Sequence, residues 1–265
     1  MEKNTEPDNT LLEGKNPVWE ALKANRPIEK ILILKTIQQE SVRGITGLAH
    51  SKKIKVEFVP KERLDALSST LRHQGVIAVC AARRYEELDN VLDTIKQQGK
   101  TPFVILLDEV QDPHNLGAVI RTAECAGAQA VVVTQHNSAG LTPATGRASA
   151  GAIEHVPVCK AQNLEQTIEK LKEQGIWVVG ADPQGKPAWE LDLTGPVALV
   201  VGGEDGGVRR LVLEKCDFLA GLPMYGKINS LNVSVAAGIL MYEVVRQRGT
   251  SAGVIPRRDH PPSGN

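Results

Sequence analysis

Hydrophobic positions follow two different patterns along the chain. Between residues 14 and 83, stretches such as "IEKILILK" and "KVEFVP" tend to alternate apolar and polar positions, and amphipathic segments separate them. From Thr101 onward the apolar runs are longer: "PFVILLDEV", "AVVVTQ", "IWVVGA", "VALVVGG" and "DFLAGLPM". Runs that are apolar on both faces are typical of a parallel sheet covered by helices on each side. The pattern predicts the α/β fold class, with two units of different size.

The first unit is expected to be a compact domain over residues 14–83. Its opening helix, "NPVWEALKAN", has Asn16 as a suitable N-cap and Pro17 at the first helical position. About 70 residues suffice for a small domain. The rest of the unit is expected to form strands at 28–35, 55–60 and 75–82 and helices at 38–52 and 61–69.

The remaining boundaries follow from changes in composition. Residues 1–13 are polar and acidic, and residues 250–265 are rich in Pro, Gly and polar residues, so both are expected to be disordered tails. Residues 84–100 are charged and predict a linker that is partly helical. The second and larger domain is expected to cover residues 101–249.

The formal net charge is zero over the 265 residues, but the charge is unevenly distributed. Residues 15–84 contain 14 Lys and Arg against 6 Asp and Glu, whereas the rest of the chain is mildly acidic. A basic N-terminal third indicates a module that binds a polyanion. The alternative at this point is a lysine-rich surface that is merely solvated.

Composition also excludes several classes of protein. No apolar run approaches the roughly 18 residues that span a bilayer, and the acidic N-terminus is unlike a secretory signal. The six histidines show no metal-binding spacing, so no metal site is predicted. The four cysteines are widely spaced with no CxxC motif, which favours reduced thiols in a cytoplasmic protein.

Three segments combine polar residues or glycines with the end of a predicted strand, where open α/β sheets bind ligands. The first, "LLDEVQDPHNLGAVIRTAECAG", runs from a buried strand through a turn to a helix expected to begin near Leu116. The helix keeps Arg121 off its apolar stripe. Read alone, Asn115 is a helix cap and Arg121 a surface arginine.

The second segment, "VALVVGGEDGGVRRLV", places glycines directly after a strand, where a ligand can approach the backbone. It lacks both GxGxxG and the P-loop lysine. The carboxylates of Glu204 and Asp205 disfavour a phosphate and favour a cationic or neutral ligand.

In the third segment, "NSLNVSVAAGILMYEVVRQR", a strand-like alternation turns into a helix. We expect a loop that feeds a helix, with Ser230 and Asn232 facing a site and Ser234 already helical. Capping of the helix by Ser230 or Asn232 is the simpler alternative.

In this order, the three segments resemble the three motifs of the SpoU (TrmH-like) branch of the SPOUT RNA methyltransferases, over residues 102–248. The chain is most similar to the RlmB subgroup, which methylates a guanosine 2′-hydroxyl of 23S ribosomal RNA. "EGKNPVWEAL" and "HQGVIAV" in the first unit resemble the L30e/L7Ae-like RNA-binding domain of these proteins.

The resemblance implies a fold and a cofactor. The C-terminal domain is expected to be a parallel sheet whose last segment forms a deep trefoil knot, a topology that hydrophobic patterns do not predict. S-adenosylmethionine is expected as the cofactor, and the domain is expected to form a homodimer. The residues implied in cofactor binding are Gly202, Gly203, Leu222 and Leu231.

The implied reaction transfers a methyl group to a ribose 2′-hydroxyl, with Arg121 as the catalytic residue. Asn115, Glu204, Ser230 and Asn232 are expected around it. Arginine is protonated at neutral pH, so a role as general base is hard to reconcile with its chemistry. We expect Arg121 to grip a phosphate and stabilise developing alkoxide charge, and Glu204 to fix its guanidinium.

RNA recognition is expected to depend on charge and shape, since only 3% of the residues are aromatic. Arg147 is a further candidate, in "GRASAGA", and a solvated surface charge is its alternative. The candidate RNA contacts are Lys15, Lys52, Lys53, Arg72 and Arg147.

Four alternative functions remain open at this point. A transfer-RNA ribose methyltransferase or a resistance-type ribosomal methyltransferase would carry the same motifs. A catalytically inactive RNA-binding ribosome factor is disfavoured by the intact motif residues. An NAD-binding domain is disfavoured by the missing GxGxxG fingerprint.

Overall fold

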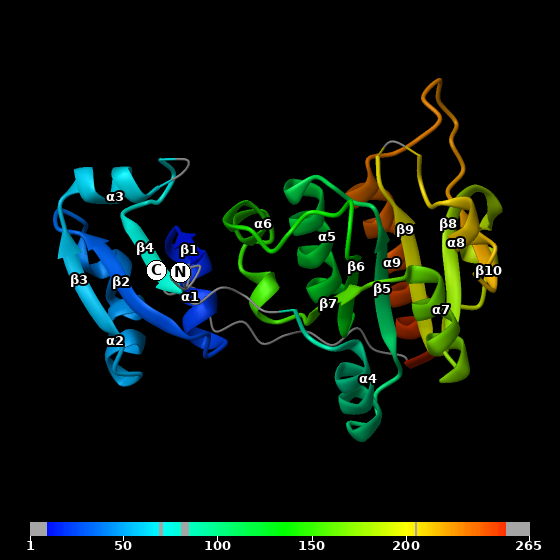
Figure 1. Ribbon diagram of the computed structural model, residues 1–265, viewed down its shortest axis with the longest axis horizontal. Coiled ribbons are helices and arrows are strands. Elements are labelled where there is room, and N and C mark those ends of the chain that lie inside the picture. The colour runs from blue at the N-terminus through cyan, green and yellow to red at the C-terminus, as the bar shows by residue number, and fades with distance from the viewer. Residues whose placement is uncertain (1–9, 69–70, 81–84, 205, 253–265) are drawn as a thin grey trace, which may run out of the picture.

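The computed structural model describes residues 10–68, 71–80, 85–204 and 206–252, which form two α/β domains joined side by side (Figure 1). The N-terminal domain has a four-stranded sheet in the order β1-β4-β2-β3. β1 and β2 each pair with β4 in the antiparallel direction, and β2 pairs with β3 in parallel. These strands are β1 Thr10–Glu13, β2 Ile28–Leu34, β3 Lys55–Val59 and β4 Val76–Cys80.

Helices cover both faces of this first sheet. One buried cluster joins residues of β2 and β4 to α1 and α2, and a smaller one joins Leu32 and Ile77 to Leu64 of α3. β4 is buried along its whole length because helices lie on both of its sides. The helices are α1 Lys15–Lys23, the short 3₁₀ helix η1 Gln39–Val42, α2 Arg43–Ser51 and α3 Lys61–Leu67.

The C-terminal domain contains a six-stranded sheet in the order β10-β8-β9-β5-β6-β7, in which every neighbouring pair is parallel. Its central strands β9 and β5 are buried at every position, as the unbroken apolar runs predict. The strands are β5 Phe103–Asp108, β6 Ala130–Thr134, β7 Val158–Ala161, β8 Trp177–Pro187, β9 Val197–Gly202 and β10 Phe218–Gly221.

Two hydrophobic clusters fill the space on either side of this sheet. One contains side chains of α5 and α9, and the other contains side chains of α4 and α7. The α/β fold with a helix-covered parallel sheet is therefore confirmed, while the trefoil knot stays a prediction. The helices are α4 Leu88–Gln97, α5 Pro113–Ala126, α6 Pro143–Ala148, η2 Ala152–Glu154, α7 Leu164–Glu173, η3 Ala188–Glu190, α8 Arg210–Leu213 and α9 Val233–Ala252.

Two strands were not anticipated from the sequence. Residues 1–13 were expected to be a tail, but Thr10–Glu13 forms β1 and pairs with β4; residues 1–9 lie outside the described part. β7 was also missed, because Val158–Ala161 is only four residues long. At the other end, α9 continues to Ala252, beyond the expected limit at residue 249, and the rest of that expected tail is not described.

The expected linker over residues 84–100 is largely a packed element. Val91, Leu92 and Ile95 of α4 belong to a hydrophobic cluster of the C-terminal domain. Glu86 forms a β-bridge with Cys159 of β7. Of the expected linker, residue 84 lies outside the described part.

Ion pairs join the two domains where α1 and β1 face α6 and η2 (Figure 1). Arg26 Nη1 lies 2.8 Å from Glu154 Oε1, and the two side chains are only 7% and 3% exposed. Arg147 Nη1 lies 3.2 Å from Glu13 Oε1, and His155 Nε2 lies 2.9 Å from Glu20 Oε2. A charge pair removed from water holds its geometry because either charge alone would be costly to bury.

Candidate active site

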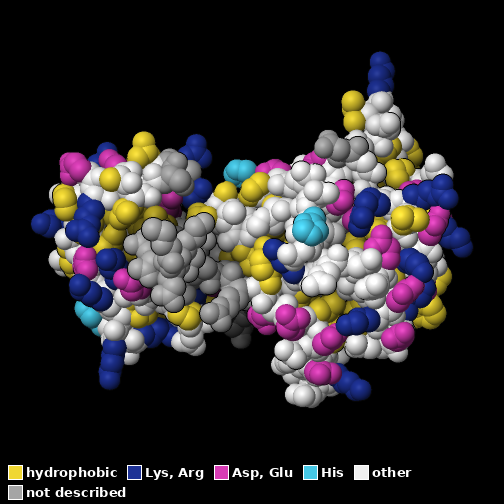
Figure 2. Space-filling view, viewed as in Figure 1, with side chains coloured by type: hydrophobic (Ala, Val, Ile, Leu, Met, Phe, Trp, Pro, Cys, Tyr) yellow, Lys and Arg dark blue, Asp and Glu magenta, His cyan; other side chains and the backbone are white. Residues whose placement is uncertain are grey.

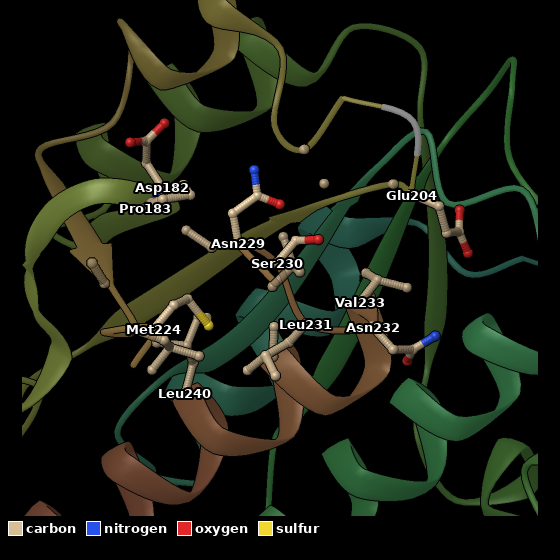
Figure 3. Close-up of a pocket in the computed structure, with 18 residues that line it drawn as sticks. Asp182, Pro183, Glu204, Met224, Asn229, Ser230, Leu231, Asn232, Val233 and Leu240 are labelled. Carbon is tan, nitrogen blue, oxygen red and sulfur yellow. The ribbon is translucent and has the colours of Figure 1, made fainter. Parts of the chain in front are cut away.

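A cavity of about 380 Å³ lies along β8, at the ends of β9 and β10 and beside the beginning of α9 (Figure 3). The carboxyl edge of an open α/β sheet is the usual place for a ligand. The cavity is within the size range of small-molecule sites. It is lined by Ala181, Asp182, Pro183, Val201, Gly202, Gly203, Glu204, Gly207, Ala220, Leu222, Met224, Asn229, Ser230, Leu231, Asn232, Val233, Ala236 and Leu240.

Backbone, without side chains, forms the wall where β9 ends. A Cβ atom on Gly202 would lie 1.8 Å from the carbonyl carbon of Gly207, and one on Gly203 would lie 2.3 Å from the carbonyl oxygen of Glu109. Real Cβ atoms do not approach other atoms so closely, so only glycine fits either position. The turn therefore packs its main chain directly against Gly207 and Glu109, with no side chain between them.

A hydrogen-bonded network joins the three motif segments beside the cavity. The Asn115 amide donates to Glu204 Oε1, and its carbonyl oxygen accepts a hydrogen bond of 3.0 Å from Asn232 Nδ2. These residues come from α5, from the turn after β9 and from the segment before α9. The hydrogen bonds orient the amides of Asn115 and Asn232, so the network forms a polar edge beside the cavity.

Asn232 also caps α9. Its Oδ1 accepts hydrogen bonds from the main-chain nitrogen and the hydroxyl of Ser234, at 2.9 and 2.6 Å. The helix-cap interpretation of Asn232 is therefore confirmed; the residue also lines the cavity, and its role in the site stays a prediction. α9 begins at Val233, so Ser234 is helical, as the sequence predicted.

α5 begins earlier than expected. Its N-cap is Asp112, which accepts from the main-chain nitrogen of His114 at 3.0 Å, and Pro113 is the first helical residue. Asn115 is therefore not the cap, and the simpler interpretation of it is wrong. The amide is left free to join Glu204 and Asn232.

Arg121 lies outside this network. It is exposed on α5, is absent from the cavity wall, and makes no hydrogen bond or ion pair to any residue that the structure describes. The expected pair between Glu204 and Arg121 is not formed, because Glu204 is bonded to Asn115. Ser230, by contrast, lines the cavity and is labelled beside Asn229 in Figure 3.

The charge of the cavity wall is negative. Asp182 and Glu204 contribute carboxylates, and no Lys, Arg or His is among the described lining residues. Leu222, Leu231 and Leu240 make the opposite part of the wall apolar. Such a wall disfavours a phosphate and favours a ligand that is cationic at one end and apolar elsewhere.

All four residues predicted to bind a cofactor line this one cavity: Gly202, Gly203, Leu222 and Leu231. Sequence reasoning missed Asp182, although it follows the predicted strand "IWVVGA" and so lies at the same edge of the sheet. It also missed Met224, which follows β10, and Asn229, the first residue of the third segment. Ala236 and Leu240 were not identified because a helical position alone does not reveal which face meets a cavity.

The candidate RNA contacts lie in the N-terminal domain, with Arg147 as the exception. Lys53 and Arg72 are exposed, and Lys15 and Lys52 are partly exposed. The Lys52 ammonium donates to Asn25 Oδ1. Arg147 is paired with Glu13 between the domains, so its described contact is structural.

No metal centre is found within the described residues, where no group of three or more His, Cys, Asp or Glu is arranged to hold an ion. Nor does any helix in that part of the chain combine the length and apolar character needed to cross a bilayer. Burial raises the pKa of the Cys80 thiol to about 11 and those of Cys159 and Cys216 to about 12. These three thiols stay protonated at neutral pH and act as small apolar side chains.

The fold and site define an α/β enzyme with a small-molecule cavity at the carboxyl edge of its sheet and a second, basic domain attached. Comparison with known families agrees. Residues 102–242 match the SpoU rRNA Methylase family, and residues 11–86 match the RNA 2′-O ribose methyltransferase substrate binding family.

Relatives match almost the whole chain. YacO of Bacillus subtilis, a TrmH-family protein, is 45% identical over 236 residues, which are 89% of this chain and 94% of the relative. An AdoMet-bound rRNA methyltransferase from Sinorhizobium meliloti is 26% identical with a TM-score of 0.75, over 90% of this chain and 87% of that one. The A. aeolicus TrmH/SpoU tRNA modifying enzyme is 28% identical with a TM-score of 0.53, over 62% of this chain and 86% of that one.

The chain therefore belongs to the SpoU rRNA methylase family of RNA 2′-O-ribose methyltransferases, which use S-adenosylmethionine. The predicted family and the predicted RNA methyltransferase activity are confirmed. The RlmB subgroup stays a prediction.

Proposed function

We propose that this protein methylates the ribose 2′-hydroxyl of a guanosine in 23S ribosomal RNA. The observation that carries the proposal is the network of Asn115, Glu204 and Asn232 at the edge of a cavity with a glycine wall. The network supplies amide groups that can orient a hydroxyl, and the cavity supplies room for a methyl donor.

The cavity fits S-adenosylmethionine by its chemistry. Gly202 and Gly203 place main chain on the cavity wall, and Leu222 and Leu231 offer apolar contact to an adenosine. The carboxylates of Asp182 and Glu204 attract a cationic sulfonium and amino group. When bound, this cofactor supplies an electrophilic methyl group.

The side chains around the cavity orient and polarise the acceptor. Ser230 and Asn232 hold the ribose so that its hydroxyl points along the line of displacement, and orientation of this kind accounts for much of the rate in a methyl transfer. Arg121, which is exposed and makes no ion pair with a described residue, grips the neighbouring phosphate and stabilises the developing alkoxide. Glu204 acts by fixing the Asn115 amide.

The N-terminal domain favours ribosomal RNA over transfer RNA as the substrate. It is basic, and it matches a substrate-binding family over residues 11–86. The S. meliloti rRNA methyltransferase covers 90% of the chain, whereas the A. aeolicus tRNA modifying enzyme covers only 62%. Lys15, Lys52, Lys53 and Arg72 contact RNA phosphates in this proposal, and Arg147 supports them from the domain interface.

The protein is also proposed to act as a cytoplasmic homodimer. Val235, Ile239 and Tyr242 follow each other at helical spacing on α9 and are 49%, 45% and 51% exposed. A second copy of this face would cover the stripe. The free cysteines are consistent with a reducing compartment.

Ribose methylation mapped in total RNA from cells with and without the gene tests this function. We expect one guanosine of 23S ribosomal RNA to lose its 2′-O-methyl group when the gene is absent, and the group to return with the wild-type gene. Loss at a transfer-RNA position would instead support the tRNA alternative, which the A. aeolicus neighbour represents. An unchanged map in both RNA classes would contradict the proposal.

A further inference from the structure

The glycine-rich turn that walls the cavity is anchored by a residue outside the cavity. Asp108, the last residue of β5, is completely buried. Its main-chain oxygen accepts a hydrogen bond of 2.9 Å from the Gly203 nitrogen. Its side chain reaches past the turn to Arg209, which follows Val208 and precedes α8. Asp108 therefore holds the turn at both of its ends.

Two hydrogen bonds and an ion pair join Asp108 to Arg209. Oδ2 accepts from the Arg209 main-chain nitrogen at 2.9 Å, Oδ1 accepts from Nε at 2.9 Å, and Nη2 lies 2.8 Å from the same Oδ1. The Asp108 side chain is 0% exposed and that of Arg209 is 44% exposed. The carboxylate of the pair therefore lies inside the protein, while the guanidinium keeps contact with water. The desolvation cost is then paid mainly for one of the two charges. The bonds to Asp108 also raise the pKa of Arg209.

Within the described residues, main-chain hydrogen bonds and the buried side chain of Val208 also hold this turn. Gly202 and Gly203 have no side chains to pack, and the turn closes on itself through a 3.1 Å bond from the Gly207 nitrogen to the Gly203 oxygen. The Glu109 carbonyl oxygen lies where a side chain on Gly203 would be. Glu109 itself has a left-handed φ of 57°, which a non-glycine residue adopts only when its surroundings hold it there. Arg209 also faces Glu109 and Glu165 at 3.9 Å.

We propose that Asp108 and Arg209 are positioning residues, which clamp the glycine turn against the end of β5 so that the cavity keeps the shape that binds the cofactor. Neither residue lines the cavity. Glu204, which accepts from the Asn115 amide, follows Gly203 in the same turn. The inference rests on the proposed function insofar as the ligand is S-adenosylmethionine.

Binding of S-adenosylmethionine to the full chain, measured by calorimetry without RNA, tests the clamp. We expect Arg209→Ala to raise the Kd on the order of 10-fold, because residues that act on a ligand site without touching the ligand have effects of this size. Arg209→Lys keeps the positive charge but replaces the planar guanidinium, whose Nε and Nη2 both approach Asp108, by a single ammonium group. Its Kd should therefore lie between those of wild type and Arg209→Ala.

The matched control is Arg210→Ala. Arg210 is the next residue, its side chain is 88% exposed, and it pairs with Glu214 of its own helical turn. Its Kd should stay within about twofold of wild type, because an exposed pair contributes little. In the double variant Asp108→Asn with Arg209→Ala, no unpaired carboxylate is left buried. Its loss of cofactor binding free energy should therefore be smaller than the sum of the losses in the two single variants.

In steady-state kinetics, Arg209→Ala should raise the KM for the cofactor by a larger factor than it lowers kcat at saturating cofactor. Equal Kd values for Arg209→Ala and Arg210→Ala would overturn the proposal, as would additive effects of the two substitutions in the double variant. If Arg209→Ala has lost its near-ultraviolet circular dichroism and does not fold, Arg209→Lys decides by the same comparison. Absence of S-adenosylmethionine binding by wild type would reject the proposed function itself, a different result.

Discussion

At the scale of single residues, Arg121 and Glu204 have separate tasks. Glu204 is committed to Asn115, and Arg121 has no internal partner among the described residues. An unpartnered guanidinium on the same helix as Asn115 is available for a phosphate of the RNA. In the proposed function, Arg121 therefore makes the contact with an RNA phosphate next to the acceptor ribose.

Arg121→Ala should abolish methyl transfer while leaving cofactor affinity nearly unchanged, because the side chain does not line the cavity. Calorimetry with S-adenosylmethionine and a transfer assay with RNA measure the two effects separately. Arg121→Lys is the companion variant, and it should recover only a small part of the activity, since a lysine lacks the bidentate fork. Loss of cofactor binding together with transfer would contradict this division.

The cysteines differ in reactivity for a physical reason. Burial raises the pKa of Cys80, Cys159 and Cys216 to about 11, 12 and 12, so these thiols remain neutral at pH 8, and the neutral thiol is a poor nucleophile. Cys125 is exposed on α5. Iodoacetamide at pH 8 should therefore give one adduct on the folded protein, at Cys125. Mass spectrometry of peptides checks the site, and the unfolded protein, with four adducts, is the control.

At the scale of elements, strands could be predicted where apolar runs are long and not where they are short. β5 and β9 were evident because both faces are buried. β1 and β7 have four residues each, and their pairing with β4 and β6 is set by tertiary contacts that the local pattern does not contain. The order β10-β8-β9-β5-β6-β7 likewise depends on contacts between distant segments.

The part of the site that lies at the ends of the strands could be predicted from the sequence, because the carboxyl ends of parallel strands meet at one edge of the sheet. The motif segments around Asn115, Glu204 and Asn232 were identified from the sequence, and the structure joins them. The Asp108–Arg209 pair was not, because a buried aspartate at the end of a strand differs from other aspartates only through its partner, 101 residues away. The position of Arg121 outside the cavity was also not predicted, because the sequence does not show which face of α5 meets the cavity.

α9 carries the element-scale prediction. Ile239→Glu places a charge in the exposed apolar stripe of Val235, Ile239 and Tyr242 and should convert a homodimer to monomer. Sedimentation velocity measures the change. Arg246→Glu, one turn further on but on an already charged position, is the control and should leave the dimer intact. A wild-type protein that sediments as a monomer would contradict the dimer.

At the scale of the whole molecule, the ion pairs Arg26–Glu154 and Arg147–Glu13 and the contact between His155 and Glu20 join the two domains. Figure 2 shows Lys and Arg side chains distributed over the surface of the N-terminal domain. A basic domain joined to a catalytic domain can select a structured RNA by shape and distance as well as by charge.

Affinity for RNA should therefore depend on salt and on the N-terminal domain. The double variant Lys53→Glu with Arg72→Glu should weaken RNA binding strongly and flatten its salt dependence, while S-adenosylmethionine affinity stays unchanged. Charge reversal is a sharper test than deletion of residues 1–84, which would leave Glu154 without Arg26. The control reverses two exposed lysines of the C-terminal domain, Lys96 and Lys100, and should bind RNA like wild type. Equal loss in both double variants would contradict the assignment.

The central claim is that the cavity and its amide network transfer a methyl group to a ribose oxygen. The most direct test incubates the full chain with methyl-labelled S-adenosylmethionine and 23S ribosomal RNA, digests the RNA to nucleosides and identifies the labelled product by mass spectrometry. We predict 2′-O-methylguanosine with wild type and almost none with Asn115→Ala. Label on a base, or equal 2′-O-methylation by wild type and Asn115→Ala, would contradict the account.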